Sequence, residues 1–185
     1  MDNGSKSYRR FLDGDNTGLV EIIRDYKDGL MLYINSIVHD IHIAEELTED
    51  TFVRLVVRRP ADKGSGSFKT WLYTMGRNRA IDYLRHSKRR QELDLDACVD
   101  SIAALHSVEE LYFREEKRRI VHQALKRLRP DYQQVLWLIY FEDFSCKQAA
   151  AVMKKKVHTV EVLVSRARKA LSEELRKEGY TREDL

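Results

Sequence analysis

The chain has 185 residues, of which 43% are hydrophobic and 34% charged, with a formal net charge of +3. The low numbers of prolines (2) and glycines (8) favour a helical protein, and the hydrophobic fraction is enough for ordinary globular cores. The sequence has no apolar run of about 18 residues, and its first residues, MDNGSKSYRR, are polar. We therefore expect neither a membrane-inserted segment nor a secretory signal, and a cytoplasmic location.

The first half of the chain predicts a series of helices. The stretch 17–38 carries apolar residues at helical intervals, and 44–59 follows it. The segment 60–67, PADKGSGS, consists of turn-forming residues and predicts a loop. Ser67 is then a suitable N-cap for the next helix.

That next helix, FKTWLYTMGRNRAIDYLR at 68–85, has apolar residues on two faces rather than one. At about 100° per residue, one face carries Phe68, Trp71, Leu72 and Met75, and the opposite face carries Tyr73, Ala80 and Leu84. Arginines and a lysine lie between these faces. Either the helix is buried on two sides, or one side is free to bind a planar, negatively charged partner. Trp71 and Tyr73 could each serve packing or DNA contact.

The second half also predicts helices. Residues 87–108 lose the helical period and predict a linker. Beyond it we expect helices at 109–128, from Pro130 onward, at 146–153 with Ser145 as N-cap, and at 157–177. No segment shows the alternation of a strand. The predicted fold is therefore all-α, with two small helical domains, 1–86 and 109–185, joined by the linker 87–108.

Charge is segregated along the chain. Residues 40–50 include five acidic residues and no basic one, whereas 144–177 include nine basic and three acidic residues. Such a separation indicates two different kinds of partner.

The last two predicted helices have the pattern of a helix-turn-helix, with a basic turn of Lys154, Lys155 and Lys156. In the second of them, one stripe is predicted to face the core: Val157, Val160, Val164, Ala167 and Leu171. The opposite face combines cations, hydroxyls and an exposed valine: His158, Thr159, Val162, Ser165, Arg166 and Lys169. These side chains suit phosphates and base edges, so we expect this face to contact DNA.

Four motifs in order resemble the bacterial sigma-70 family, specifically its two-domain extracytoplasmic-function group. AEELTEDTFVRL resembles region 2.2, and the helix 68–85 resembles regions 2.3 and 2.4. LRPDYQQVLWLIYFEDFSCKQAAAVM resembles region 4.1, and HTVEVLVSRARKAL resembles the recognition helix of region 4.2.

The resemblance implies a subunit that binds RNA polymerase core, directs it to promoters and helps open DNA near the −10 element, without enzymatic chemistry of its own. Glu46, Glu49 and Asp50 match positions that contact the basic β′ clamp helices of the core. The resemblance also implies an anti-sigma protein as a partner.

The resemblance further implies two DNA-binding sets. For −10 binding and melting these are Lys63, Ser65, Trp71, Arg77, Asn78, Arg79 and Arg85. For the −35 element they are the three turn lysines, 154–156, and the exposed face of the last helix described above. Capture of an unstacked base and contacts to phosphates would supply the binding energy.

The sequence departs from the family pattern at several positions. Glu49 replaces the usual Gln of region 2.2, and His158 replaces the usual Gly before Thr-Val. Glu161-Val162-Leu163 replaces a common Lys-Ser-Arg run, and Lys154 replaces a common Gly in the turn. Each departure bears on which promoter is read.

Two other functions remain open on the residues alone. One is a stand-alone helix-turn-helix regulator that binds duplex DNA without polymerase. The other is an all-α enzyme with a metal site at His39 and His42, near Asp40 and Glu45. No further His or Cys is spaced to complete such a site, and Cys98 and Cys146 are too far apart for a CxxC motif. We therefore expect no metal or cofactor.

Overall fold

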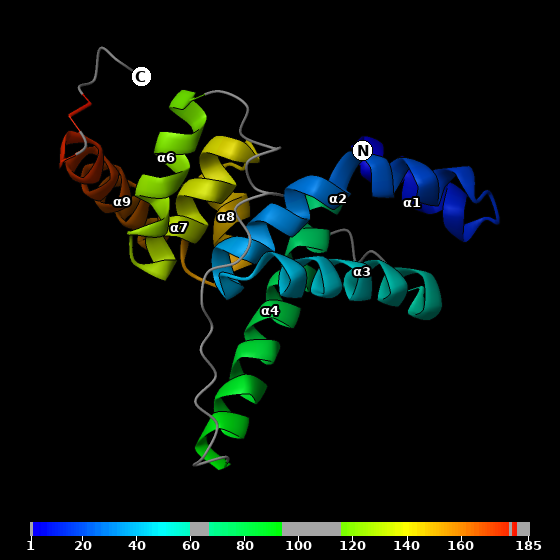
Figure 1. Ribbon diagram of the computed structural model, residues 1–185. Coiled ribbons are helices and arrows are strands. Elements are labelled where there is room, and N and C mark those ends of the chain that lie inside the picture. Colours follow the sequence, from blue (N-terminus) through cyan, green and yellow to red (C-terminus); the bar gives the residue numbers. More distant parts are fainter. Residues whose placement is uncertain (1, 60–66, 94–115, 178, 181–185) are drawn as a thin grey trace.

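The computed structural model describes residues 2–59, 67–93, 116–177 and 179–180, and within these ranges the chain forms helices and no strand (Figure 1). The N-terminal domain contains α1 (Asn3–Leu12), α2 (Thr17–Val38), α3 (Ile41–Arg58) and α4 (Phe68–Leu93). The C-terminal domain contains α6 (Glu116–Lys126), α7 (Pro130–Leu136), the π-helical turn η1 (Trp137–Phe141), α8 (Cys146–Met153) and α9 (Val157–Lys177). The all-α, two-domain prediction is confirmed.

Helix starts follow the predicted caps. Ser67 Oγ accepts from the Thr70 amide at 3.2 Å, and Ser145 forms a reciprocal capping box with Gln148. Asp2 has a further role that the sequence did not indicate, because its carboxylate accepts from the amides of Ser5 in α1 and Phe68 in α4. A single side chain therefore joins the starts of two helices.

Most helix bounds agree with the sequence, but α4 does not end where predicted. It continues to Leu93, through the expected start of the linker at residue 87. The apolar period does stop there, but Lys, Arg, Gln, Glu and Leu are good helix formers, and their helix propensity continues the helix. Figure 1 shows this end of α4 projecting away from the other helices.

An aromatic cluster forms much of the N-terminal core. Phe68 is fully buried, with its ring centroid 5.4 Å from that of Tyr8 and 5.7 Å from that of Tyr26. Gly4 in α1 permits this packing, because a Cβ there would lie 2.5 Å from the Phe68 ring. Helix α1 is thereby held against the start of α4.

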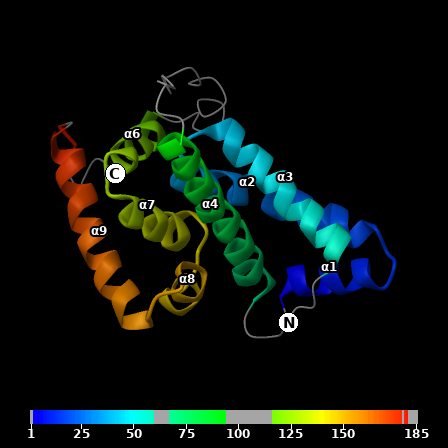
Figure 2. The same ribbon diagram turned by 90° about the horizontal axis from the view of Figure 1, so that it is seen from below.

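The two domains contact each other through α4. Figure 2 shows α4 lying between α3 on one side and α7 and α8 on the other. Helix α2 also contacts α7 and η1. In the second apolar face, Tyr73 and Ala80 are fully buried, and Tyr73 packs against Phe144 of the C-terminal domain, whereas Leu84 is 37% exposed. Burial on two sides is therefore the alternative observed for the first part of α4. Among the described helices, none combines the length and apolar character needed to cross a membrane.

Candidate nucleic-acid interface

The acidic residues predicted for polymerase contact lie on α3, but they differ in availability. Glu46 and Glu49 are exposed, and Glu49 is only loosely paired with Lys27, at 3.9 Å. Asp50 forms a close ion pair with Arg79 of α4. Glu46 and Glu49 therefore present their charge outward, while the charge of Asp50 is paired with a cation of α4.

The exposed side of α3 continues as an apolar surface that the sequence analysis did not single out. Val53 and Val57 are 57% and 75% exposed. They follow Glu49 at spacings of four and eight residues, which place all three on one side of the helix. The spacing of Glu49, Val53 and Val57 in the sequence could have identified this apolar surface.

A cationic pocket of about 430 Å³ lies beside α4 and brings together residues from both predicted DNA-binding sets. Arg77, Asn78, Arg79 and Arg85 of the −10 set line it together with Lys154 of the turn between α8 and α9. Arg54 of α3, which the sequence analysis missed, lines it as well. It lies four residues after Asp50, one helical turn along α3.

The partners of these cations leave the pocket positively charged. Arg77 Nε donates to Gln134 Oε1 at 3.2 Å across the domain boundary. Arg85 lies 3.7 Å from Asp82, an exposed pair of small energetic weight. Within the described ranges, no carboxylate pairs with Arg54 or Lys154. A phosphate-bearing ligand therefore fits the pocket electrostatically.

Trp71 packs against α1. Its ring centroid lies 5.3 Å from that of Tyr8 and 5.6 Å from that of Phe68, and the side chain is partly buried. Lys63 and Ser65 lie outside the described residues.

Replacing Trp71 by Ala should destabilise the protein by about 1–3 kcal/mol, since a half-buried ring is lost from the aromatic cluster. Trp71→Phe should restore most of that loss. Thermal unfolding measures both effects, and an unchanged midpoint in Trp71→Ala would contradict the packing role. At temperatures where the variant stays folded, we expect Trp71→Ala to reduce open-complex formation more than binding to core polymerase. An equal loss of both would indicate a folding defect.

Tyr73 is fully buried between the domains. Of the two roles considered for it, packing and DNA contact, packing is therefore the one observed. Its ring lies 5.1 Å from that of Phe144, and its hydroxyl donates to Glu142 Oε2 at 2.5 Å. Burial, together with the charge of Glu142, raises the pKa of Tyr73 well above its ordinary value. The phenol therefore stays protonated and keeps donating.

The helix-turn-helix forms as predicted, with one correction to its core stripe. Val160 and Ala167 are fully buried and Val164 and Leu171 partly so, but Val157 is 41% exposed because it begins α9 at the turn. On the opposite face, the exposed residues are His158, Thr159, Ser165, Arg166 and Lys169. Val162 was expected to be exposed and is partly buried.

The turn itself is strained at Lys154, which has φ 53°. Glycine adopts this conformation without steric cost, whereas lysine does not. The Lys154 side chain lines the cationic pocket. Lys155 lies 3.5 Å from Asp131 of α7, and Lys156 is exposed.

Comparison with known proteins gives two family matches. The description "Sigma-70 region 2" matches residues 22–90, and "Sigma-70, region 4" matches residues 118–171. Together they cover more than half of the chain. The chain belongs to the sigma-70 family.

Relatives of this sigma-70 protein match along most of their length. It is 25% identical over 179 residues to ECF RNA polymerase sigma factor SigW of Bacillus subtilis (strain 168), covering 92% of this chain and 96% of that protein. It is 28% identical over 171 residues to the RNA polymerase sigma-H factor of Pseudomonas aeruginosa, covering 88% of each.

Solved structures share the fold. The sigma factor RpoE in complex with the anti-sigma factor NepR from Bartonella quintana matches with a TM-score of 0.70 and 24% identity, over 84% of this chain and 95% of that one. CnrH in complex with the cytosolic domain of CnrY matches with a TM-score of 0.68 and 20% identity, over 95% and 99%.

The family matches relate the surfaces described above to sigma regions. Region 2 begins within α2 and ends within α4, so it contains the acidic side of α3 and the α4 cations. Region 4 begins within α6 and ends within α9, so it contains the helix-turn-helix. Helix α1 and the last three residues of α4 lie outside the region 2 match.

Proposed function

We propose that this chain is a promoter-specificity subunit that binds RNA polymerase core, directs it to promoters and assists DNA opening. The observation that carries the proposal is the presence of sigma-70 regions 2 and 4 in one chain. The similarity to extracytoplasmic-function sigma factors supports the same group here.

Within this function we assign Glu46, Glu49 and Asp50 to the clamp helices of the core. Arg77, Asn78, Arg79 and Arg85, with Lys63, Ser65 and Trp71, are assigned to the −10 element. The basic turn and the exposed face of α9 are assigned to the −35 element. An anti-sigma protein is a further proposed partner, because the structural neighbour RpoE was solved in complex with the anti-sigma factor NepR.

Run-off transcription with purified core polymerase tests the function. Promoters are first mapped after overexpression of this chain, and the mapped templates are then transcribed with core alone and with core plus this protein. Specific transcripts only in the second reaction support the proposal. A stand-alone helix-turn-helix regulator would instead bind the same DNA without core and produce no core-dependent start.

Arg166→Ala should weaken recognition of the mapped −35 element by about 1–3 kcal/mol, the range for one specific side chain–base contact. Arg166 is exposed on the DNA-facing side of α9. Titration of the assembled holoenzyme on promoter DNA measures the change. Arg176→Ala, an exposed arginine in the last turn of the same helix, is the matched control. Equal affinities for the two variants would remove Arg166 from the contact set.

A further inference from the structure

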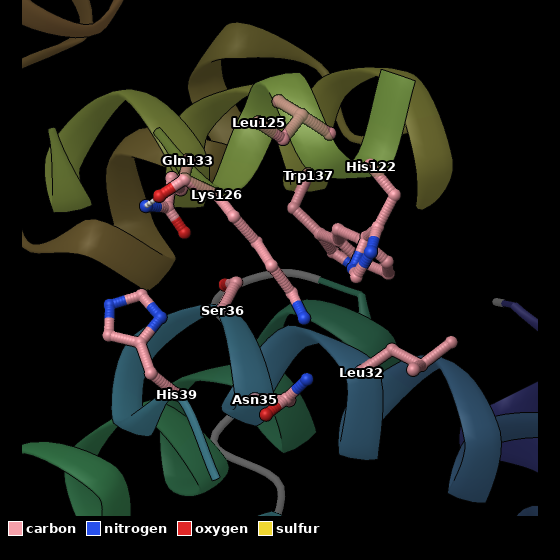
Figure 3. A pocket seen from close by; sticks show the side chains of 9 residues that line it. All are labelled: Leu32, Asn35, Ser36, His39, His122, Leu125, Lys126, Gln133 and Trp137. Carbon is pink, nitrogen blue, oxygen red and sulfur yellow. Dashed lines mark hydrogen bonds between the residues drawn. The ribbon is translucent and has the colours of Figure 1, made fainter. Parts of the chain in front are cut away.

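A cavity of about 220 Å³ lies between α2 and the consecutive elements α6, α7 and η1 (Figure 3). Its inner wall includes the buried side chains of Asn35, Gln133 and Trp137. Its outer edge includes His39 and Lys126, which are exposed. A solute can therefore enter from this edge, and a cavity of about 150 Å³ is already large enough to bind benzene.

The indole N–H of Trp137 is a hydrogen-bond donor without an acceptor. Trp137 is 4% exposed, and within the described residues its Nε1 has no hydrogen-bond partner. Its ring is held between two others, stacked on Phe141 at 4.4 Å and edge-on to His122 at 6.1 Å between centroids. Figure 3 shows the side chain extending from η1 toward α2. Buried donors are nearly always paired, so a ligand of the cavity can supply the acceptor.

The cavity also carries a positive charge. Figure 3 shows Lys126 extending from the end of α6 toward α2, beside the other lining side chains. The described lining residues include the imidazoles of His39 and His122 and no carboxylate. Desolvation, and to a lesser extent the charge of Lys126, lowers the pKa of His39 below its ordinary value. At neutral pH this imidazole is therefore uncharged, and Lys126 is the cation that would attract an anion.

A buried amide fixes the end of α6 that carries this cation. Gln133 Nε2 donates to the carbonyl oxygens of Leu128 at 2.8 Å and Lys126 at 3.2 Å. Carbonyls at a helix C-terminus have no partner within the helix, so this amide ties the end of α6 to α7. Leu32 and Leu125 add apolar surface to the lining. A largely preformed, partly apolar cavity with a few polar groups is typical of small-molecule sites.

We propose that this cavity binds a small organic carboxylate. Lys126 pairs with the carboxylate, Trp137 Nε1 donates to one of its oxygens, and Leu32 and Leu125 contact its apolar part. A carboxylate suits the site because its two oxygens accept from two donors at once. The inference is independent of the proposed function, since no lining residue belongs to the polymerase-binding or DNA-binding sets.

Nuclear magnetic resonance of the isotopically labelled full chain tests the site, with benzoate as the probe. The chain has two tryptophans, Trp71 and Trp137, and therefore two indole N–H signals. The Trp137 signal, identified by its loss in Trp137→Phe, should shift downfield and saturate as benzoate is added. The Trp71 signal, from the N-terminal aromatic cluster, should stay in place. Benzamide has the same ring without the charge and should bind at least several-fold more weakly.

Two variants separate the contributions of charge and hydrogen bond. Lys126→Met removes the charge and keeps a long side chain, and should weaken benzoate binding about 10-fold or more, the range for a hydrogen bond to a charged group. Trp137→Phe keeps a ring but removes the N–H, and should weaken binding about 3-fold. Lys147→Met makes the same charge change at an exposed position of α8 outside the cavity, and should bind benzoate like the wild type. Calorimetric titration measures all four proteins.

An unmoved Trp137 signal at millimolar benzoate would overturn the proposal, and so would equal affinities for benzoate and benzamide. Equal benzoate affinities of Lys126→Met and Lys147→Met would also overturn it, because the charge would then act from outside the cavity. Circular dichroism confirms that each variant is folded. If Trp137→Phe does not fold, Trp71→Phe identifies the two indole signals instead, and the comparison of the two lysine variants decides.

Discussion

Replacing Glu46 and Glu49 together by lysine is expected to weaken binding to core polymerase about 100-fold or more, because like charges brought together at an interface cost several kcal/mol. Both side chains are exposed on α3, so the reversal should leave the fold intact. Fluorescence anisotropy of labelled protein titrated with core measures the affinity. Circular dichroism melting, performed alongside, should show a midpoint close to that of the wild type.

Asp50 is a poorer probe of the same surface, because its ion pair with Arg79 joins α3 to α4. Reversing its charge would place two cations together at the partly exposed contact between α3 and α4, and would confuse a loss of binding with a loss of stability. The matched control is Asp25→Lys with Asp28→Lys, which makes the same charge change at exposed positions of α2. If this control loses core affinity as severely as the α3 pair, the assignment of α3 as the polymerase-binding side is wrong.

Phe68→Ala is expected to destabilise the protein by about 3–5 kcal/mol, the range for truncating a buried phenylalanine. Phe68 is fully buried and its ring contacts Tyr8, Tyr26 and Trp71, so truncation leaves a cavity where α1, α2 and α4 meet. In a chain of this size the loss corresponds to a fall in melting temperature of roughly 6–20 °C.

Leu84→Ala in the same helix provides the comparison. Leu84 is 37% exposed, so its truncation should change stability by less than about 1 kcal/mol. Calorimetry or denaturant unfolding measures both variants. A Phe68→Ala protein as stable as Leu84→Ala would mean that the aromatic cluster is not the centre of the N-terminal core.

Helix positions were largely predictable, because they follow from local patterns. Helices α2 and α9 have the bounds that apolar spacing predicted, and Ser67 and Ser145 cap the helices they were expected to cap. The prediction failed where periodicity and propensity disagree. Residues 87–93 lack an apolar face and were assigned to the linker, yet their helix-forming composition continues α4.

The sequence predicted which residues belong to the candidate sites, but not how those residues contact one another. The sequence identified the acidic residues of α3 and the cations of α4, but not that Asp50 pairs with Arg79, nor that Arg54 and Lys154 line one pocket. These are contacts between residues far apart in the chain, which no local period encodes.

The sequence by itself determined the helices, their caps, the two apolar faces of α4 and the sigma-70 motifs, since each is a local pattern of side chains. Only the tertiary structure decided what covers the second face of α4. Tyr73 meets Glu142 across 69 positions of sequence, and Gly29 leaves the space in which they meet. A period shows that a helix face is apolar, but the shape and charge of the surface opposite decide which element covers it.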